Sequence, residues 1–212
     1  MEILPDLLQQ YLEAHCEAEP EALQAINRET YLKVLQPNML SGHYQGRLLS
    51  FLSKLMQPKL ILEVGTFTGY STICLAEGLR EGGLIHTIEV NREMEDMLIA
   101  NFKKANISEK VILHFGPAAQ IISNMNEKDI DIAFIDADKK NNYLYFCLLF
   151  DKIRSGGLII IDNVLWKGKV FGPENDTDTK IIRELNDQIA ADERVEKLIL
   201  PVRDGLLVIR KR

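Results

Sequence analysis

Three oxygen-bearing side chains stand at the ends of two apolar segments. Asp136 closes the run Ile130–Asp136, and Asp162 closes the run Leu158–Asp162 with Asn163 directly after it. A single Asp after a strand is more often a helix cap. If the two runs are neighbouring strands, however, the three side chains converge at one edge of the sheet. Oxygen ligands without cysteine or histidine favour a hard divalent cation, Mg²⁺ first and Mn²⁺ or Ca²⁺ as alternatives.

Lys139 follows Asp136 by three residues and stands next to Lys140. A dication close to a lysine disfavours the charged ammonium, so the amine can accept a proton. We therefore expect Lys139 to act as a general base, with Asp136 beside it in the catalytic site. The alternative is an exposed lysine at a helix start, a role for which Lys140 is the better choice.

Two glycines join the first apolar run to a helical segment within Leu62–Ser71. Gly65 and Gly69 are spaced G-x-x-x-G, whereas a pyrophosphate requires G-x-G-x-x-G at the helix N-terminus. Glu63, just before the turn, suits a cationic ligand better than a pyrophosphate. Glu89, at the end of the second run, can accept both hydroxyls of a ribose. The segment therefore favours S-adenosylmethionine, which has a sulfonium and no phosphate, although a plain strand-to-helix turn is the alternative for the glycines alone.

Weaker signals surround this turn. Ser71 could either cap the helix or bind the carboxylate of the cofactor, and Ala118 could admit the adenine after the third run. Met39 and Ser41 precede the sheet and could close over the methionine end. His43 lies in the same segment, where a histidine is more often structural than functional.

Alternating apolar runs and amphipathic segments predict the elements that position these residues. The expected strands are Lys59–Val64, Leu84–Val90, Val111–Phe115, Ile130–Asp136, Leu158–Asp162, Glu196–Leu200 and Leu206–Arg210. The expected helices are Tyr70–Arg80, Arg92–Asn106, Ala118–Asn124, Asn141–Ile153 and Thr179–Ala191, with Gly82-Gly83 and Gly156-Gly157 separating a helix from the next strand.

This alternation predicts an α/β fold with a Rossmann-like, mostly parallel seven-stranded sheet and helices on both faces. The first five strands should be buried on both faces. The last two runs have hairpin spacing, so the last strand should be antiparallel.

Residues 1–57 have a different pattern from the core at 58–212, within what we expect to be a single domain. Three amphipathic helices are predicted there, at Leu4–Cys16, Pro20–Leu35 and Gly46–Met56. This N-terminal appendage could pack on the domain, on a neighbouring subunit or over the active site.

The composition is that of an ordinary globular chain. The 212 residues are 46% hydrophobic, and the net charge of −6 without a basic stripe disfavours a polynucleotide substrate. Three cysteines without a C-x-x-C pair, Cys16, Cys74 and Cys147, predict reduced core thiols and a cytoplasmic protein. The acidic start and the lack of a long apolar stretch predict neither a signal peptide nor a membrane span.

Together these segments resemble the cation-dependent O-methyltransferase family that includes catechol and caffeoyl-CoA O-methyltransferases. The similarity runs from about Met39 to the C-terminus and is strongest in LEVGTFTGYST, FIDADKKNNY and IIIDNVLWKGKV. The resemblance implies a metal held by Asp136, Asp162 and Asn163, with Lys139 as the base. It also implies that the cofactor contacts Glu63, Gly65, Ser71, Glu89, Ala118 and Asp138.

The resemblance also implies an acceptor and a reaction. Trp166 would wall the acceptor pocket, and the segment MLSGHYQG looks like that of bacterial members. No residues match those that would grip coenzyme A, so a free catechol-like phenol is favoured over a CoA thioester. In the expected reaction the cation chelates both vicinal oxygens, Lys139 takes the proton and the phenolate accepts the methyl group. A homodimer is expected from the family.

Three other readings of the sequence are disfavoured. A nucleotide-dependent oxidoreductase would need a phosphate-binding turn, which the segment Gly65–Gly69 does not supply. A nucleic-acid N-methyltransferase of this fold would usually carry an Asn/Asp-Pro-Pro motif where Asp136–Lys139 stands. A non-catalytic binding module would not need a metal trio with an adjacent lysine.

Overall fold

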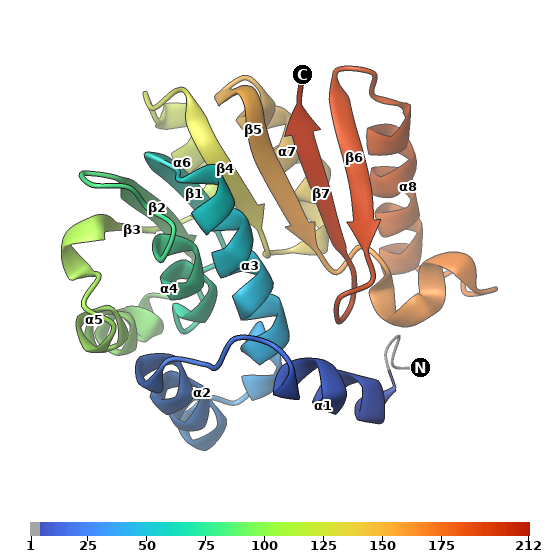
Figure 1. The fold of residues 1–212 in the computed structure, drawn as a ribbon. Coiled ribbons are helices and arrows are strands. Elements are labelled where there is room, and N and C mark those ends of the chain that lie inside the picture. The colour runs from blue at the N-terminus through green and yellow to red at the C-terminus, as the bar shows by residue number, and fades with distance from the viewer. Residues whose placement is uncertain (1–4) are drawn as a thin grey trace.

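A seven-stranded sheet between two helical layers forms the centre of the computed structural model, which describes residues 5–212 (Figure 1). The strands are β1 (Leu60–Val64), β2 (Leu84–Glu89), β3 (Val111–Phe115), β4 (Ile130–Ile135), β5 (Ile153–Asp162), β6 (Val195–Leu200) and β7 (Leu206–Lys211). Their order is β3-β2-β1-β4-β5-β7-β6, with β1 to β5 parallel and β7 antiparallel to both of its neighbours. The predicted Rossmann-like sheet with an antiparallel last strand is confirmed.

Two apolar clusters fix the helical layers to the sheet. The helices are α1 (Asp6–Ala14), α2 (Glu21–Lys33), α3 (Gly42–Met56), α4 (Tyr70–Ala76), α5 (Glu95–Lys104), α6 (Ala118–Asn124), α7 (Asn142–Phe150) and α8 (Thr177–Ala191). Buried residues of α2, α3, α4 and α5 pack on one face of the sheet. Those of α6, α7 and α8 pack on the other. Since both faces are covered, the central parallel strands can be apolar on both sides.

The start of β5 differs from the sequence prediction. The helix expected to reach Ile153 ends at Phe150, and Ile153 already pairs with Ile130 in the sheet. Gly156-Gly157 therefore lie inside β5 instead of before it. A Cβ at Gly157 would lie 2.7 Å from the Ile153 side chain, so this irregular stretch needs a glycine to let the chain pass close to its own neighbours.

Two further predictions about burial are wrong. β3 lies at the edge of the sheet and is only partly buried, with Ile112 exposed, because an edge strand has a neighbour on one side only. Of the three cysteines, Cys74 is buried as expected, whereas Cys16 is half-buried and Cys147 is exposed. The helical spacing around Cys147 places it on the outer side of α7.

The N-terminal helices lie at the edge where the central parallel strands end. Figure 1 shows α1 and α2 below the sheet, on the side towards which the arrows of β4 and β5 point. Leu23 and Ile26 of α2 are fully buried in the same cluster as α4 and α5, so this part of the appendage packs on the domain. α3 begins at Gly42 and not at the expected Gly46, and Leu4 of the first expected helix lies outside the described residues.

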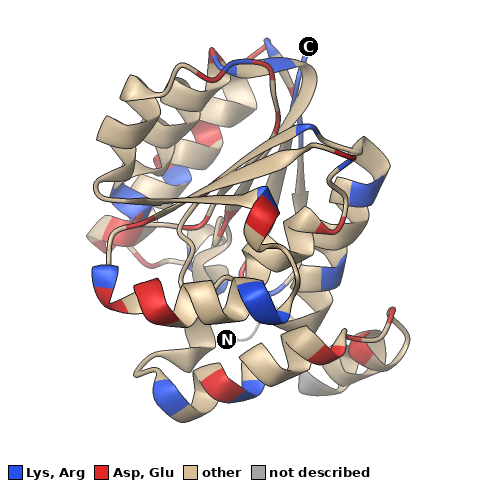
Figure 2. Ribbon diagram, turned by 90° about the vertical axis from the view of Figure 1, so that its left-hand side faces the viewer, with Lys and Arg blue, Asp and Glu red and all other residues tan. Residues whose placement is uncertain are grey.

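The surface charges show no segregation in the view of Figure 2. Lysines and arginines alternate with acidic residues along the helices of that face. None of the helices within residues 5–212 has the length and apolar character needed to cross a bilayer.

Candidate active site

The turn from β1 to α4 lies directly against the end of β4. Gly65 has a φ of +100°, and a Cβ there would lie 1.9 Å from the main-chain oxygen of Asp136. Gly69 has a φ of +81°, and its Cβ would lie 2.6 Å from the ring of Phe102. From the sequence, both glycines were expected to let a ligand approach the backbone closely. In the structure the packing of the protein on itself already requires them, and Gly65 also lines the main cavity.

Glu63 lies beneath this turn and not on the cavity wall. Its side chain is fully buried, and its Oε2 accepts hydrogen bonds from the hydroxyls of Thr72 and Thr87, the latter at 2.6 Å. Burial raises the pKa of Glu63 to about 7, although hydrogen bonds from Ser71 and these two threonines oppose the shift. Its Oε1 is buried and has no hydrogen-bond partner within the described chain.

Glu89 stands at the end of β2 with its carboxylate held by the main chain. Its Oε2 accepts from the backbone N–H of Phe67 at 2.8 Å, and its Oε1 accepts from those of Val90 and Asn91 at 2.9 Å. The side chain is therefore fixed beside Phe67, which lines the cavity.

The three predicted metal ligands come together because β4 and β5 are adjacent parallel strands. Ile135 pairs with Ile161, so Asp136 and Asp162 follow paired positions and end at the same edge. Asn163 follows in a left-handed conformation, with a φ of +63°, and lines the same cavity. The arrangement therefore joins two carboxylates and one amide within a single wall.

The surroundings of Asp136 and Asp162 disfavour the ionised form of both carboxyl groups. Burial, and then the charge of Asp162, raise the pKa of Asp136 to about 7, although Lys139 and Arg203 oppose the shift. Burial also raises the pKa of Asp162, against a hydrogen bond from Gln45 Nε2 at 2.7 Å. Two close carboxyl groups in a poorly solvated site need positive charge to ionise together.

Lys139 supplies part of that charge. Its Nζ lies 3.5 Å from Oδ1 of Asp136, donates to the main-chain oxygen of Ala137 at 3.2 Å and donates to Oδ1 of Asn163. The ammonium thus contacts two of the three predicted ligands. Among the described side chains, no three His, Cys, Asp or Glu residues cluster in a way that could hold a metal ion. The predicted ligand set contains only two such residues, Asp136 and Asp162, and its third member is Asn163.

One large cavity, of about 1020 Å³, connects the glycine turn with these carboxylates. Most of the predicted site residues line it: Met39, Ser41, Gly65, Ser71, Asp136, Lys139, Asp162, Asn163 and Trp166. His43 lines it as well, and its Nε2 lies 2.8 Å from the main-chain oxygen of Glu17. α1 and α2 contribute Gln9, Glu13 and Tyr31 to the same wall, so the appendage also covers the site.

Four predicted cofactor residues do not line the cavity. They are Glu63 and Glu89, described above, and Ala118 and Asp138. Ala118 begins α6 and packs against the apolar cluster of that face. Asp138 accepts a hydrogen bond from the hydroxyl of Tyr145 at 2.6 Å and so anchors α7 next to the predicted metal ligands.

Two side chains in this wall, Gln45 and Arg203, were not predicted from the sequence. Gln45 is 1% exposed and bonds Asp162, and its Oε1 has no partner within residues 5–212. The segment MLSGHYQG contains it, but nothing in the spacing links Gln45 to a residue 117 positions later. Arg203 stands in the turn between β6 and β7 and reaches the segment before α3.

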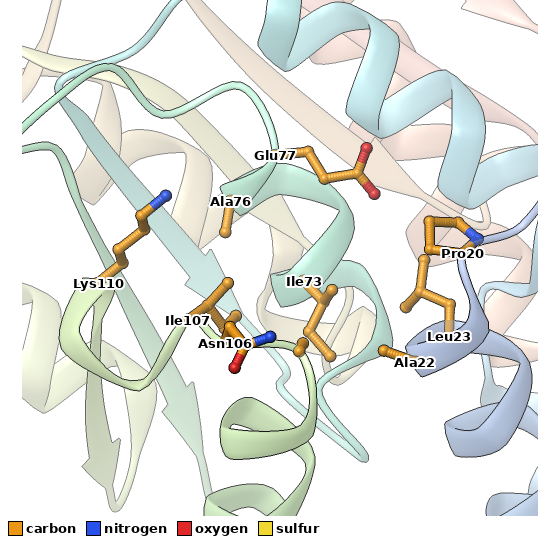
Figure 3. A pocket seen from close by; sticks show the side chains of 10 residues that line it. Pro20, Ala22, Leu23, Ile73, Ala76, Glu77, Asn106, Ile107 and Lys110 are labelled. Atoms are coloured by element: carbon orange, nitrogen blue, oxygen red, sulfur yellow. The ribbon is translucent and has the colours of Figure 1, made fainter.

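A second hollow, of about 300 Å³, lies away from this chemistry (Figure 3). It is lined mainly by apolar residues, including Leu23, Ile73 and Ile107. Its one carboxylate, Glu77, already accepts hydrogen bonds from Arg47, Ser50 and Lys54, so it is not available to a ligand. The larger cavity, which brings the predicted site residues together, is therefore the candidate site.

Comparison with known proteins identifies the family of this chain. A family model described as O-methyltransferase matches residues 13–212. The chain is 35% identical to caffeoyl-CoA O-methyltransferase 1 of Arabidopsis thaliana, over 97% of this chain and 84% of that protein.

Solved structures give the same result. An O-methyltransferase from Bacillus cereus in complex with SAH is 32% identical, with a TM-score of 0.88 and 97% of each chain covered. The O-methyltransferase TomG of Streptomyces achromogenes, in complex with SAM, is 27% identical, with a TM-score of 0.87 and coverage of 95% and 94%. The chain thus belongs to the O-methyltransferase family that contains the caffeoyl-CoA O-methyltransferases, and it is an S-adenosylmethionine-dependent O-methyltransferase.

Proposed function

We propose that the protein methylates one hydroxyl of a small phenol with two vicinal hydroxyls, and that it does so with a divalent cation held by Asp136, Asp162 and Asn163. One observation carries the proposal: two carboxylates whose pKa values are both raised, Asp136 to about 7, end adjacent strands in the cavity that the glycine turn also lines. A bound dication would relieve their repulsion and leave open positions for two substrate oxygens.

The donor set fits such an ion. Two carboxylates and an amide oxygen are hard ligands, and neither sulfur nor imidazole lies among them. Gln45 fixes the orientation of Asp162, as the outer partner of a metal ligand does. Lys139 contacts Asn163 and Asp136, so its side chain already places positive charge beside these donor atoms.

The cofactor is proposed to lie along the glycine turn. Gly65 and Ser71 line the cavity from that turn, and Met39 and Ser41 line it from the segment before α3. We place Glu63, Glu89, Ala118 and Asp138 near the cofactor as well, although they do not line the cavity. The unpartnered Oε1 of Glu63 is the observation that supports this for the first of them.

The residues of the chain then have separate tasks. Bound S-adenosylmethionine would supply the electrophilic methyl group, and a bound cation would supply positive charge that favours the phenolate. Lys139 is assigned the role of proton acceptor at Nζ, where Asp136 Oδ1 and the oxygen of Ala137 stabilise the resulting ammonium. Trp166 walls the acceptor end and helps to exclude water.

A CoA thioester is the second candidate acceptor. The Arabidopsis relative is named for caffeoyl-CoA, and it covers nearly the whole chain. Lys167 and Arg203 line the cavity and could meet phosphates, although Glu13 and Glu19 line it too and would repel them. This balance of charge favours the free phenol.

A methyl-transfer assay tests both parts of the proposal. We expect caffeic acid to be methylated faster than caffeoyl-CoA, activity to disappear in EDTA, and Mg²⁺ to restore it. Asp136→Ala should abolish the activity, while Asp187→Ala, at an exposed position of α8, should retain it. Full turnover in EDTA would reject the metal, and faster turnover of the thioester would reject the acceptor.

We also propose that the protein is a homodimer that acts on a small molecule. Tyr31, Leu32 and Leu35 are exposed apolar side chains in and just after α2, and a second copy would cover them. Light scattering at assay concentrations should give twice the mass of one chain. A monomer there would contradict this proposal without affecting the others.

A further inference from the structure

The segment Asn38–Gly42 forms one side of the main cavity. All five of its residues line that cavity, and it joins the N-terminal helices to α3. The segment contains only one short turn of its own, in which the N–H groups of Met39 and Leu40 bond oxygens three residues earlier. Its position in the wall must therefore depend on contacts with the rest of the chain.

Arg203 makes those contacts from the opposite end of the sequence. Its Nη1 donates to the main-chain oxygens of Leu40 and Ser41, and its Nη2 donates to that of Asn38 at 3.2 Å. Three carbonyl groups of one short segment thus converge on a single guanidinium. A planar group with several donors in fixed directions can bridge them, whereas an ammonium is a single point of charge.

The backbone of Arg203 has a conformation that glycine adopts more easily than arginine. Its φ is +48°, in the left-handed region that costs free energy for every residue except glycine. The turn is closed by a hydrogen bond from Gly205 N to Val202 O at 2.8 Å. A glycine would adopt this conformation without strain, whereas the arginine adds a side chain that reaches the Asn38–Ser41 segment.

We propose that Arg203 is a positioning residue that holds the Asn38–Ser41 segment as a wall of the cofactor pocket. The affinity for the cofactor then depends on the turn between β6 and β7. This inference rests on the proposed position of the cofactor beside Met39 and Ser41. The hydrogen bonds from Arg203 to the segment form within the protein, so their effect on the segment can be measured without any ligand.

Two variants separate the bridging role from the charge. Arg203→Gly removes the guanidinium and relieves the backbone strain. Arg203→Lys keeps the positive charge but places all its donors on one nitrogen, so it cannot reproduce contacts made from two separate nitrogens of a planar group. In the ligand-free protein we expect faster amide hydrogen exchange at residues 38–41 in both variants. By calorimetry we expect S-adenosylhomocysteine to bind roughly tenfold more weakly to Arg203→Gly, since hydrogen bonds to a charged group are lost. Arg203→Lys should recover only a small part of that loss.

The outcomes distinguish this inference from the proposed function. Wild-type protein that fails to bind S-adenosylhomocysteine would reject the proposed site itself. If the wild type binds and Arg203→Gly matches it in both affinity and exchange, only the positioning role is rejected. Full recovery of affinity by Arg203→Lys would also overturn it, because charge alone would then explain the effect. If Arg203→Gly does not fold, the exchange and affinity of Arg203→Lys decide the question.

Discussion

Replacing Gly65 by alanine tests how tightly the glycine turn packs against the main chain of Asp136. The new Cβ would lie 1.9 Å from the main-chain oxygen of Asp136. An ordinary contact is nearly twice as long, so one of the two backbone segments must move by about 1.5 Å. The clashing atom belongs to the main chain directly after β4 and not to a flexible side chain. The movement therefore displaces Asp136 itself.

Gly82→Ala is the matched control. Gly82 has a φ of +71°, similar in sign to the +100° of Gly65, but a Cβ there meets nothing within 4 Å. Its substitution should cost only the left-handed strain of about 1–2 kcal/mol. Gly65→Ala should add an overpacking cost of about 1–3 kcal/mol, giving about 2–5 kcal/mol in total.

Thermal unfolding measures the difference. For a chain of this size, we expect Gly82→Ala to lower Tm by about 2–8 °C and Gly65→Ala by about 4–20 °C. At a temperature where both variants are folded, only Gly65→Ala should lose affinity for S-adenosylhomocysteine. Equal losses of stability in the two variants, with intact binding in both, would refute the close packing of Gly65 against Asp136.

Three further predictions concern buried polar groups. Gln45→Met should weaken Mn²⁺ binding, followed by electron paramagnetic resonance, by about 10–100-fold because Asp162 loses its orienting partner, while the exposed Gln188→Met should not. Burial raises the pKa of Glu63 to about 7, so the folded state binds a proton that the unfolded chain releases near pH 4.5. Glu63 should therefore contribute stability below pH 4.5 that is lost as the pH rises to 7, by on the order of 3 kcal/mol. In urea unfolding, Glu63→Gln should remove this part of the slope and leave the part that comes from Asp136. Burial alone would raise the pKa of Glu77, but hydrogen bonds from Arg47, Lys54 and Ser50 lower it to about 2. The stability that ionised Glu77 contributes should thus be complete above pH 4.5 and be lost as the pH falls towards 2. If the free energy of unfolding of Glu77→Gln depended on pH as that of the wild type does in this range, the prediction would be contradicted.

The local pattern of the sequence was enough to predict the central strands of the sheet and the edge at which the candidate site lies. Buried parallel strands are continuous apolar runs, so β1, β2 and β4 could be located within a residue or two. Chain direction then places Asp136 and Asp162 at the carboxyl edge, because all parallel strands end there. Neither step requires knowledge of contacts distant in sequence.

Contacts between distant segments decided the rest. The start of β5 depends on its pairing with β4 beyond a β-bulge, which no periodicity within residues 141–162 reveals. The bond from Gln45 to Asp162 spans 117 positions, and the bonds from Arg203 to the segment before α3 span more than 160. The type of a residue and its near neighbours set strand, helix and turn. Which side chain completes a site depends on how those elements pack, and that is a property of the folded chain as a whole.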